Sequence, residues 1–222
     1  MKTLIGVPCM DMVQTRFANS LMNLRKSENT YYATLTSSLI YDSRNNIAAT
    51  AINKGYDRVL WLDSDMEFQP DLLEKLTADM NSENLEYVSA LYFKRKIPTS
   101  PVVYKKLEYG RTEEGILRAK GHTYYDYPRD QLFECAGSGF GAVLVSVKLM
   151  QDVWDHYGPP FDPMTQLGED LSFCWRVGQL GRKMWCDSRI KAGHVGPFVF
   201  TEDIYLNQNQ KDESEDADNQ NE

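Results

Sequence analysis

Apolar and polar positions follow two distinct rhythms over the first 93 residues of the chain. Short runs rich in apolar or β-prone residues predict strands at 4–7, 30–39, 56–62 and 88–93. Between these runs, apolar residues recur every three or four positions, which predicts amphipathic helices at 17–24, 43–54 and 70–80. This alternation predicts an α/β fold with a mainly parallel central sheet and helices on both faces.

The ends of two of these helices carry recognisable residues. Asp42 or Ser43 is expected to cap the helix that follows the second strand, and Gly55 is expected to end it. Pro70 is expected in the first turn of the next helix, where its missing N–H has no consequence. We therefore expect both helices to lie between strands as crossover connections.

The helical rhythm stops after residue 93. The next segment, 94–136, is basic and rich in Tyr and Gly, and we expect only short strands there, at 102–104 and 132–135. Later elements are expected as an apolar strand, a short helix, a longer helix and a last clear strand at 142–147, around 150–154, 169–180 and 183–186. This half predicts a small mixed or antiparallel second part beside the main sheet.

The acidic charge of the chain is concentrated at its end. The formal net charge is −8 over 222 residues, and six acids against one lysine after residue 206 account for −5 of it. We therefore expect one domain over 1–206 and a disordered acidic tail over 207–222. The nearly neutral body gives no reason to expect a nucleic-acid partner.

The four cysteines are far apart and form no CxxC pair. This spacing suits neither a disulfide scaffold nor a zinc knuckle, so we expect reduced and mostly buried thiols. The apolar stretch at 4–7 is too short for a signal peptide, and no apolar run reaches the length of a membrane span. We expect a soluble, cytoplasmic protein.

Asp63-Ser64-Asp65 follows a predicted strand at its carboxyl end, where ligands of open α/β sheets collect. Two carboxylates one residue apart repel each other unless a cation lies between them. Mg²⁺ and Mn²⁺ prefer oxygen ligands, so the pair is a candidate metal site. The alternative is a helix-capping turn, where Asp is also common.

Two other segments carry candidate chemistry. Glu169-Asp170 is a second carboxylate pair, at the start of a predicted helix whose dipole would also favour acids there. His194 lies between Gly193 and Gly196, which allow close approach of the backbone to a ligand. A structural role is the alternative for the histidine, as dipole stabilisation is for the acids.

Together, these segments resemble glycosyltransferases of the A-type (GT-A) fold, especially the family-2-like group. The segment 62–66, followed by Pro70-Asp71, looks like the DxD segment of that family. Gly137 to Ala142, with Gly139, Phe140 and Gly141, looks like its acceptor-side loop, and 168–176 is similar to its ED-containing helix. His194 falls where many members place a third metal ligand. The resemblance covers roughly residues 1–200.

The resemblance implies a role for each of these residues. Asp65, with Asp63 and His194, would hold Mn²⁺ or Mg²⁺ on the diphosphate of a nucleotide-sugar donor, and Asp63 could instead face the ribose. Asp170, beside Glu169, would be the general base on the hydroxyl of a carbohydrate or other acceptor.

Three further segments complete the expected site. Val7 and Pro8 would line the nucleoside pocket, and Arg44-Asn45 resembles a phosphate-facing pair, with a surface arginine capping its own helix as the alternative. Lys94-Arg95-Lys96 is either a phosphate clamp or a solvated loop.

The expected reaction is therefore transfer of a single sugar to an acceptor hydroxyl. The Gln-x-x-Arg-Trp motif of processive synthases in this family does not occur in the chain. One alternative is a nucleotidyltransferase that forms nucleotide sugars, although the segment after the first strand, 8–11, lacks the expected Gly-rich basic loop. The other is a non-catalytic nucleotide- or sugar-binding module of the same fold.

Overall fold

A computed structural model describes residues 1–207 of the chain. Its centre is a seven-stranded sheet with the order β2-β1-β3-β10-β5-β11-β8. These strands are β1 Thr3–Cys9, β2 Thr30–Thr36, β3 Arg58–Leu62, β5 Tyr87–Leu91, β8 Leu132–Cys135, β10 Ala142–Ser146 and β11 Met184–Lys191. β10 is antiparallel to both of its neighbours and β8 is antiparallel to β11, whereas the other strands run in one direction. The predicted mainly parallel α/β sheet is confirmed.

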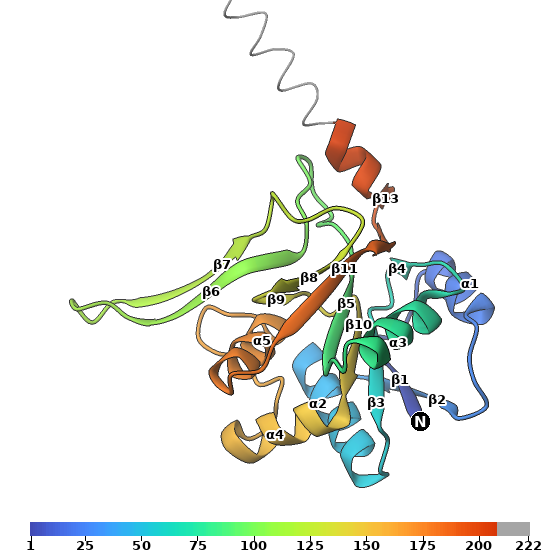
Figure 1. The fold of residues 1–222 in the computed structure, drawn as a ribbon, viewed down its shortest axis with the longest axis horizontal. Coiled ribbons are helices and arrows are strands. Elements are labelled where there is room, and N and C mark those ends of the chain that lie inside the picture. Colours follow the sequence, from blue (N-terminus) through green and yellow to red (C-terminus); the bar gives the residue numbers. More distant parts are fainter. Residues whose placement is uncertain (208–222) are drawn as a thin grey trace, which may run out of the picture.

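Five helices flank the sheet (Figure 1): α1 Thr15–Asn23, α2 Ile40–Asn53, α3 Leu72–Ser82, α4 Val147–Tyr157 and α5 Glu169–Gln179. One core cluster joins apolar residues of α2, α4 and α5 to one face of the sheet. A second cluster joins α1 and α3 to the other face. Successive strand residues supply the two clusters in turn: Val59 and Trp61 belong to the first, Leu60 and Leu62 to the second. Helices on both faces, as the sequence predicts, follow from this alternation.

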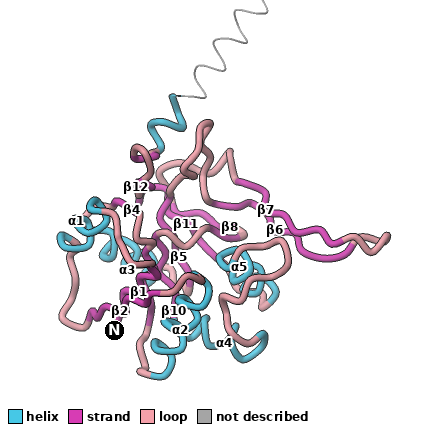
Figure 2. The backbone as a smooth tube through the Cα atoms, turned by 180° about the vertical axis from the view of Figure 1, so that it is seen from behind, coloured by secondary structure: helices cyan, strands magenta, loops and turns pink. Residues whose placement is uncertain are grey.

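Two small sheets complete the fold. One has the order β13-β12-β4 and the other the order β7-β6-β9. Their strands are β4 Met66–Glu67, β6 Val103–Arg111, β7 Leu117–Thr123, β9 Gly137–Ser138, β12 Gly193–Val195 and β13 Val199–Phe200. The strands β6 and β7 form a hairpin that projects from the body of the molecule beside α5 (Figures 1 and 2). The predicted antiparallel second part is present.

Several local predictions need correction. Asp42 and Ser43 do not cap α2: the N-cap is Leu39, and Ser43 Oγ instead donates a hydrogen bond to Leu35 O in β2. Pro70 lies before α3 rather than in its first turn, because Asp71 is the N-cap.

The second half of the chain holds more strand than expected. The short strand expected at 102–104 extends to Arg111, and its partner β7 was not predicted. The short strands β12 and β13 follow what was expected to be the last clear strand, β11.

The chain ends, as far as the structure describes it, in a helical segment at 202–207. Tyr205 from this segment packs against Phe93, with ring centroids 5.2 Å apart. Of the predicted disordered tail 207–222, residues 208–222 lie outside the described residues. Among the helices at 1–207, none combines the length and apolar character needed to cross a membrane. All four cysteines are free and three are buried, as predicted.

Candidate functional site

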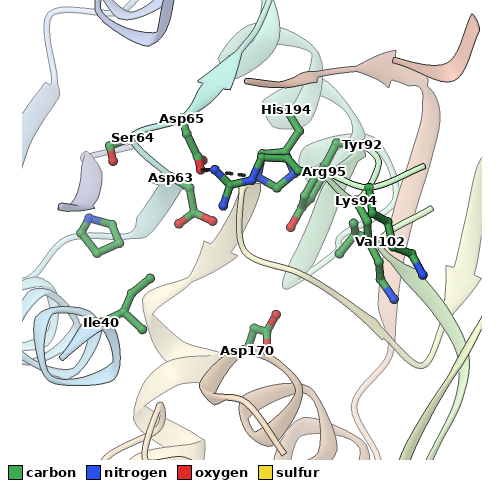
Figure 3. A pocket seen from close by; sticks show the side chains of 12 residues that line it. Ile40, Asp63, Ser64, Asp65, Tyr92, Lys94, Arg95, Val102, Asp170 and His194 are labelled. Carbon is green, nitrogen blue, oxygen red and sulfur yellow. Dashed lines mark ion pairs between the residues drawn. The ribbon is translucent and has the colours of Figure 1, made fainter. Parts of the chain in front are cut away.

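A cavity of about 550 Å³ opens where the strands β1, β3 and β5 end. Its wall includes Pro8 at the end of β1, Asp63 and Asp65 after β3, and Tyr92 after β5. Asp170 at the start of α5 and His194 on β12 face the same space (Figure 3). Further wall residues are Ile40, Ser64, Lys94, Arg95, Lys96 and Val102. The candidate acids and the histidine, distant in the chain, therefore meet at the carboxyl ends of the parallel strands.

Arg44 is buried behind the cavity, where it bonds to the wall residue Asp63. Its side chain is 1% exposed, and it donates hydrogen bonds to Asp63 Oδ1 at 2.7 Å and to Glu169 Oε1 at 3.3 Å. The guanidinium also lies over the rings of Phe140 and Trp61, with centroid distances of 5.3 and 5.7 Å. The alternative of a surface arginine capping its own helix is excluded. Arg44 is instead a buried cation that ties β3 to α5.

The two acids of the DxD segment have opposite electrostatic environments. Burial, reinforced by the charge of Asp65, raises the pKa of Asp63 despite its bond to Arg44. Burial also acts against ionisation of Asp65, but the hydrogen bond and charge of His194 and the charge of Arg95 outweigh it and lower the pKa of Asp65. Asp65 is therefore the carboxylate with the stronger preference for negative charge.

Asp65 and His194 form the second feature of the wall. Nε2 of His194 lies 3.5 Å from Oδ2 of Asp65, while Nδ1 lies 2.9 Å from the carbonyl oxygen of Phe93. A carbonyl oxygen only accepts, so Nδ1 carries a proton, and because the carboxylate also only accepts, Nε2 is the donor in its contact with Asp65. A cation bound between Nε2 and Oδ2 would take the place of that Nε2 proton. Nη1 of Arg95 reaches the same Oδ2 atom at 2.8 Å. The carboxylate of Asp65 is therefore already paired with a cation, the guanidinium of Arg95, whose side chain is 47% exposed.

The three expected metal ligands, Asp63, Asp65 and His194, are only partly brought together. Among residues 1–207, no three His, Cys, Asp or Glu side chains gather closely enough to hold a metal alone. Asp63 is directed to Arg44, so the predicted trio of Asp63, Asp65 and His194 is not assembled as one ligand set. Asp65 and His194 do bring a carboxylate oxygen and a ring nitrogen within 3.5 Å of each other. This pair fits a divalent cation that takes its remaining ligands from phosphate and water, as Mg²⁺ commonly does.

Asp170 faces the acids of the DxD segment across the cavity (Figure 3). It lies in the first turn of α5, and its Oδ1 accepts a hydrogen bond from the backbone N–H of Leu171 at 2.7 Å. Burial, followed by the charge of Glu169, raises the pKa of Asp170 to about 6. A carboxyl group with this pKa is ionised at neutral pH yet is more basic than an ordinary aspartate.

The loop at 137–141, the expected acceptor-side loop, does not line the cavity and packs instead behind one of its wall residues, Tyr92. Phe140 is 1% exposed and packs edge-on against Phe161 and Phe173 in the core, so its ring does not reach the cavity. A Cβ atom at Gly139 would lie 2.1 Å from the hydroxyl of Tyr92, and one at Gly141 would lie 2.9 Å from its ring. The glycines are therefore required because Tyr92, which sequence analysis did not identify, occupies this space.

The remaining sequence candidates separate into lining and supporting residues. Pro8 lines the cavity, whereas Val7 is fully buried one residue earlier in β1. Asn45 does not line the cavity: its amide donates to Asp162 Oδ1 at 2.8 Å and accepts from Phe161 N at 2.8 Å. Asn45 thus fixes the segment before α5.

Three residues that line the cavity, Ile40, Tyr92 and Val102, were not candidates from the sequence. Ile40 begins α2, and Val102 immediately precedes β6. Tyr92 is the last residue but one of the strand predicted at 88–93, and its place near the carboxyl end of a strand could have identified it as a lining residue.

No protein-family model matches the chain, and no curated protein matches it significantly. Among solved structures, A197 from STIV aligns with a TM-score of 0.62 and 19% identity over 88% of this chain and 86% of that chain. GalNAc-T7, crystallised with UDP, GalNAc and Mn²⁺, aligns with a TM-score of 0.56 and 10% identity over 88% of this chain and 44% of that chain. The chain therefore has a GT-A-like fold.

Proposed function

We propose that this protein is a metal-dependent glycosyltransferase that moves one sugar from a nucleotide-diphosphate sugar to an acceptor hydroxyl. The observation that carries the proposal is the meeting of Asp65 and His194 with Asp170 across one cavity. An oxygen–nitrogen ligand pair on one side and a carboxylate of raised pKa on the other match the two ends of a glycosyl transfer. The GT-A-like fold supports this assignment, as does GalNAc-T7, whose crystals contain UDP, GalNAc and Mn²⁺.

Asp65 and His194 are the proposed protein ligands of Mn²⁺ or Mg²⁺. When bound there together with the donor diphosphate, the cation supplies Lewis-acid stabilisation of charge on the leaving group. Asp65 contributes a carboxylate whose lowered pKa keeps it ionised, and His194 contributes Nε2 while its Nδ1 stays fixed by Phe93 O. Asp63 is assigned to the ribose side of the donor, because Arg44 already occupies its Oδ1.

The basic segment at 94–96 faces the proposed diphosphate position. Lys94, Arg95 and Lys96 line the cavity together. Burial, followed by the nearby charge of Lys96, lowers the pKa of Lys94, which indicates that cationic charge is crowded at this wall. A diphosphate would relieve that crowding. We assign these residues to the phosphates rather than to a solvated loop.

Asp170 is the proposed general base of an inverting transfer. Its carboxylate removes the proton from the acceptor hydroxyl while that oxygen forms a bond to the anomeric carbon of the donor. The bond from the anomeric carbon to the phosphate oxygen breaks, and the nucleoside diphosphate leaves with the electron pair. A pKa of about 6 suits this role near neutral pH, since the group is ionised but remains basic.

The test is glycosyl transfer, or donor hydrolysis, by the full chain with a set of nucleotide sugars in Mn²⁺ and in chelator. Asp170→Asn should lower kcat by about 10²–10⁴-fold while leaving donor affinity nearly unchanged. Asp162→Asn is the matched control, because that carboxylate bonds to Asn45 and does not line the cavity. Near wild-type turnover in Asp170→Asn would remove this residue from catalysis. A chain that turns over no nucleotide sugar would support a non-catalytic binding module instead.

A further inference from the structure

A second cavity, of about 390 Å³, lies between the projecting hairpin and α5. The hairpin contributes Leu107, Glu108, Tyr109, Gly110, Arg111, Thr112 and Arg118, and α5 contributes Trp175 and Gln179. None of these residues belongs to the catalytic cavity. The proposed transfer chemistry therefore leaves this hollow without a role.

An aromatic cluster lies at the second cavity: Tyr109 and Trp175 line it, and Tyr157 packs against Trp175 without lining it. The ring centroids of Tyr109 and Trp175 are 5.4 Å apart and meet edge to face, at 62°. Tyr157 from α4 lies next to the same indole, with centroids 6.4 Å apart, and is 41% exposed. Aromatic side chains that keep an exposed face offer both an apolar surface and polar edges to a ligand.

Close packing holds the hairpin against α5. A Cβ atom at Gly121 of β7 would lie 2.7 Å from the ring of Tyr104 and 3.2 Å from Leu171, the residue after Asp170. A Cβ atom at Gly137 of β9 would lie 2.6 Å from the Cβ of Cys174, the residue before Trp175. The backbone can approach α5 this closely only because these positions are glycine. The wall of the second cavity is therefore fixed relative to the catalytic helix.

The polar groups around the aromatic cluster can bind hydroxyl groups. The side chain of Arg118 has no hydrogen bond or ion pair among the described residues, and Gln179 is exposed in the same wall. Glu108 is already paired with Lys106 and His122. A few polar side chains around aromatic rings are typical of sites for small polar ligands.

Two elements connect this cavity to the proposed reaction site. Val102 lines the catalytic cavity, and β6, which begins at the next residue, reaches the second cavity at Leu107. Asp170 and Trp175 lie on the same helix, five positions apart, which is about 8 Å along its axis and about 140° around it. A chain that presents its hydroxyl to Asp170 reaches the aromatic cluster by passing around α5 toward β6, which Trp175 faces through Tyr109.

We propose that this second cavity binds a saccharide chain as an extended acceptor subsite, an inference that rests on the proposed transferase function. Trp175 and Tyr109 supply the stacking surface, while Arg118 and Gln179 bind the hydroxyl groups. A nucleic acid is the less suitable occupant, because the lining holds only two cations, Arg111 and Arg118, against the acid Glu108, which is little positive charge for a polyanion. The acceptor would then be an oligosaccharide rather than a small alcohol or a protein side chain.

The test is an array of immobilised oligosaccharides probed with the full chain in the absence of donor and metal. Solution affinity for the best array member is then measured for wild type and for three variants. Trp175→Ala should weaken binding about tenfold, the loss of one stacked aromatic contact. Arg118→Ala, at an exposed position where folding is not at risk, should weaken it several-fold. Tyr31→Ala, which removes a 46% exposed aromatic from the opposite edge of the sheet, should have no effect.

Each outcome decides the proposal. Absence of binding to every array member overturns the subsite. Trp175→Ala and Arg118→Ala variants that both bind the saccharide as tightly as wild type also overturn it. Tighter binding of a single-stranded RNA that is lost in Trp175→Ala also overturns it, in favour of nucleic acid. Because no donor is present, the result does not depend on turnover. Saccharide binding at Trp175 without any sugar transfer would reject the transferase function alone, and transfer without such binding would reject the subsite alone.

Discussion

Asp63 and Asp65 are two residues apart on one turn, but the two sides of the cavity that they form differ in kind. On the Asp63 side, a cation that is 1% exposed, Arg44, bonds to two acids from different elements. On the Asp65 side, the cation is Arg95, which is 47% exposed, and a histidine nitrogen faces the same oxygen atom. A buried, multiply bonded cation is part of the fold, whereas an exposed one can be exchanged for another. The contrast separates Asp63, which is bonded into the fold by Arg44, from Asp65, which is proposed to hold the metal.

The largest expected effect comes from removing the buried cation. Arg44→Ala leaves Asp63 and Glu169 facing each other without a counter-ion, and removing one partner of a buried pair costs about 3–5 kcal/mol. Urea unfolding should show this loss in the free energy of unfolding. Arg95→Ala is the matched control and should cost about 0–1 kcal/mol, as expected for an exposed pair. Similar losses for the two variants would mean that the Arg44–Asp63 pair is no more a part of the fold than the Arg95–Asp65 pair.

The next effect concerns Asp170, which faces both sides. The proposed base works only when ionised, so the transfer rate should be level above its pKa of about 6 and should fall about tenfold per pH unit below it. A pH profile of kcat/KM for the free enzyme measures this directly. The residual rate of Asp170→Asn should lack that inflection. An inflection that survives the substitution would assign the titration to another group.

The smallest expected effect sharpens the Asp65 side. Arg95 and the proposed metal approach the same oxygen of Asp65, so Arg95→Ala should tighten Mn²⁺ binding in the absence of nucleotide, by about two- to fivefold given the worth of an exposed pair. Titration of Mn²⁺ by electron paramagnetic resonance measures the affinity. Lys75→Ala, which breaks an exposed pair with Asp71 away from the cavity, is the control. Weaker Mn²⁺ binding in Arg95→Ala would mean that the two cations do not compete.

The regular half of the fold could be predicted because each of its elements is recorded in local periodicity. The strands β1, β3 and β5 are short buried runs, and α2, α3 and α5 carry apolar stripes toward the sheet. The hairpin could not be predicted as fully, since much of β6 and β7 is exposed and its residues show no buried face. Strands β12 and β13 are also short, and they depend on pairing with each other and with distant Met66–Glu67.

The candidate site shows the same division. Carboxyl ends of parallel strands meet at one edge, so the sequence could indicate that Asp63 and Asp65 lie where a ligand binds. Asp170 begins a helix, and only the resemblance to a family placed it beside them. The partner of each acid could not be read from the sequence. Arg44 reaches Glu169 across 125 positions and Arg95 lies 30 positions from Asp65. Which acid is committed to the fold and which is available to a metal depends on these distant contacts.

The central claim is that Asp65, with His194, holds a divalent cation on the donor diphosphate. Its most direct test is the thermal stability of the full chain with UDP and with GDP, each with and without Mn²⁺. Wild type should be stabilised by its nucleotide only when Mn²⁺ is present, by about 2.7 kcal/mol at a ligand concentration one hundred times Kd. Asp65→Asn should abolish the Mn²⁺-dependent part. Asp63→Asn, which weakens both the pair with Arg44 and the proposed ribose contact, should melt at a lower temperature and keep a reduced Mn²⁺-dependent part. Unchanged Mn²⁺-dependent stabilisation in Asp65→Asn would contradict the account.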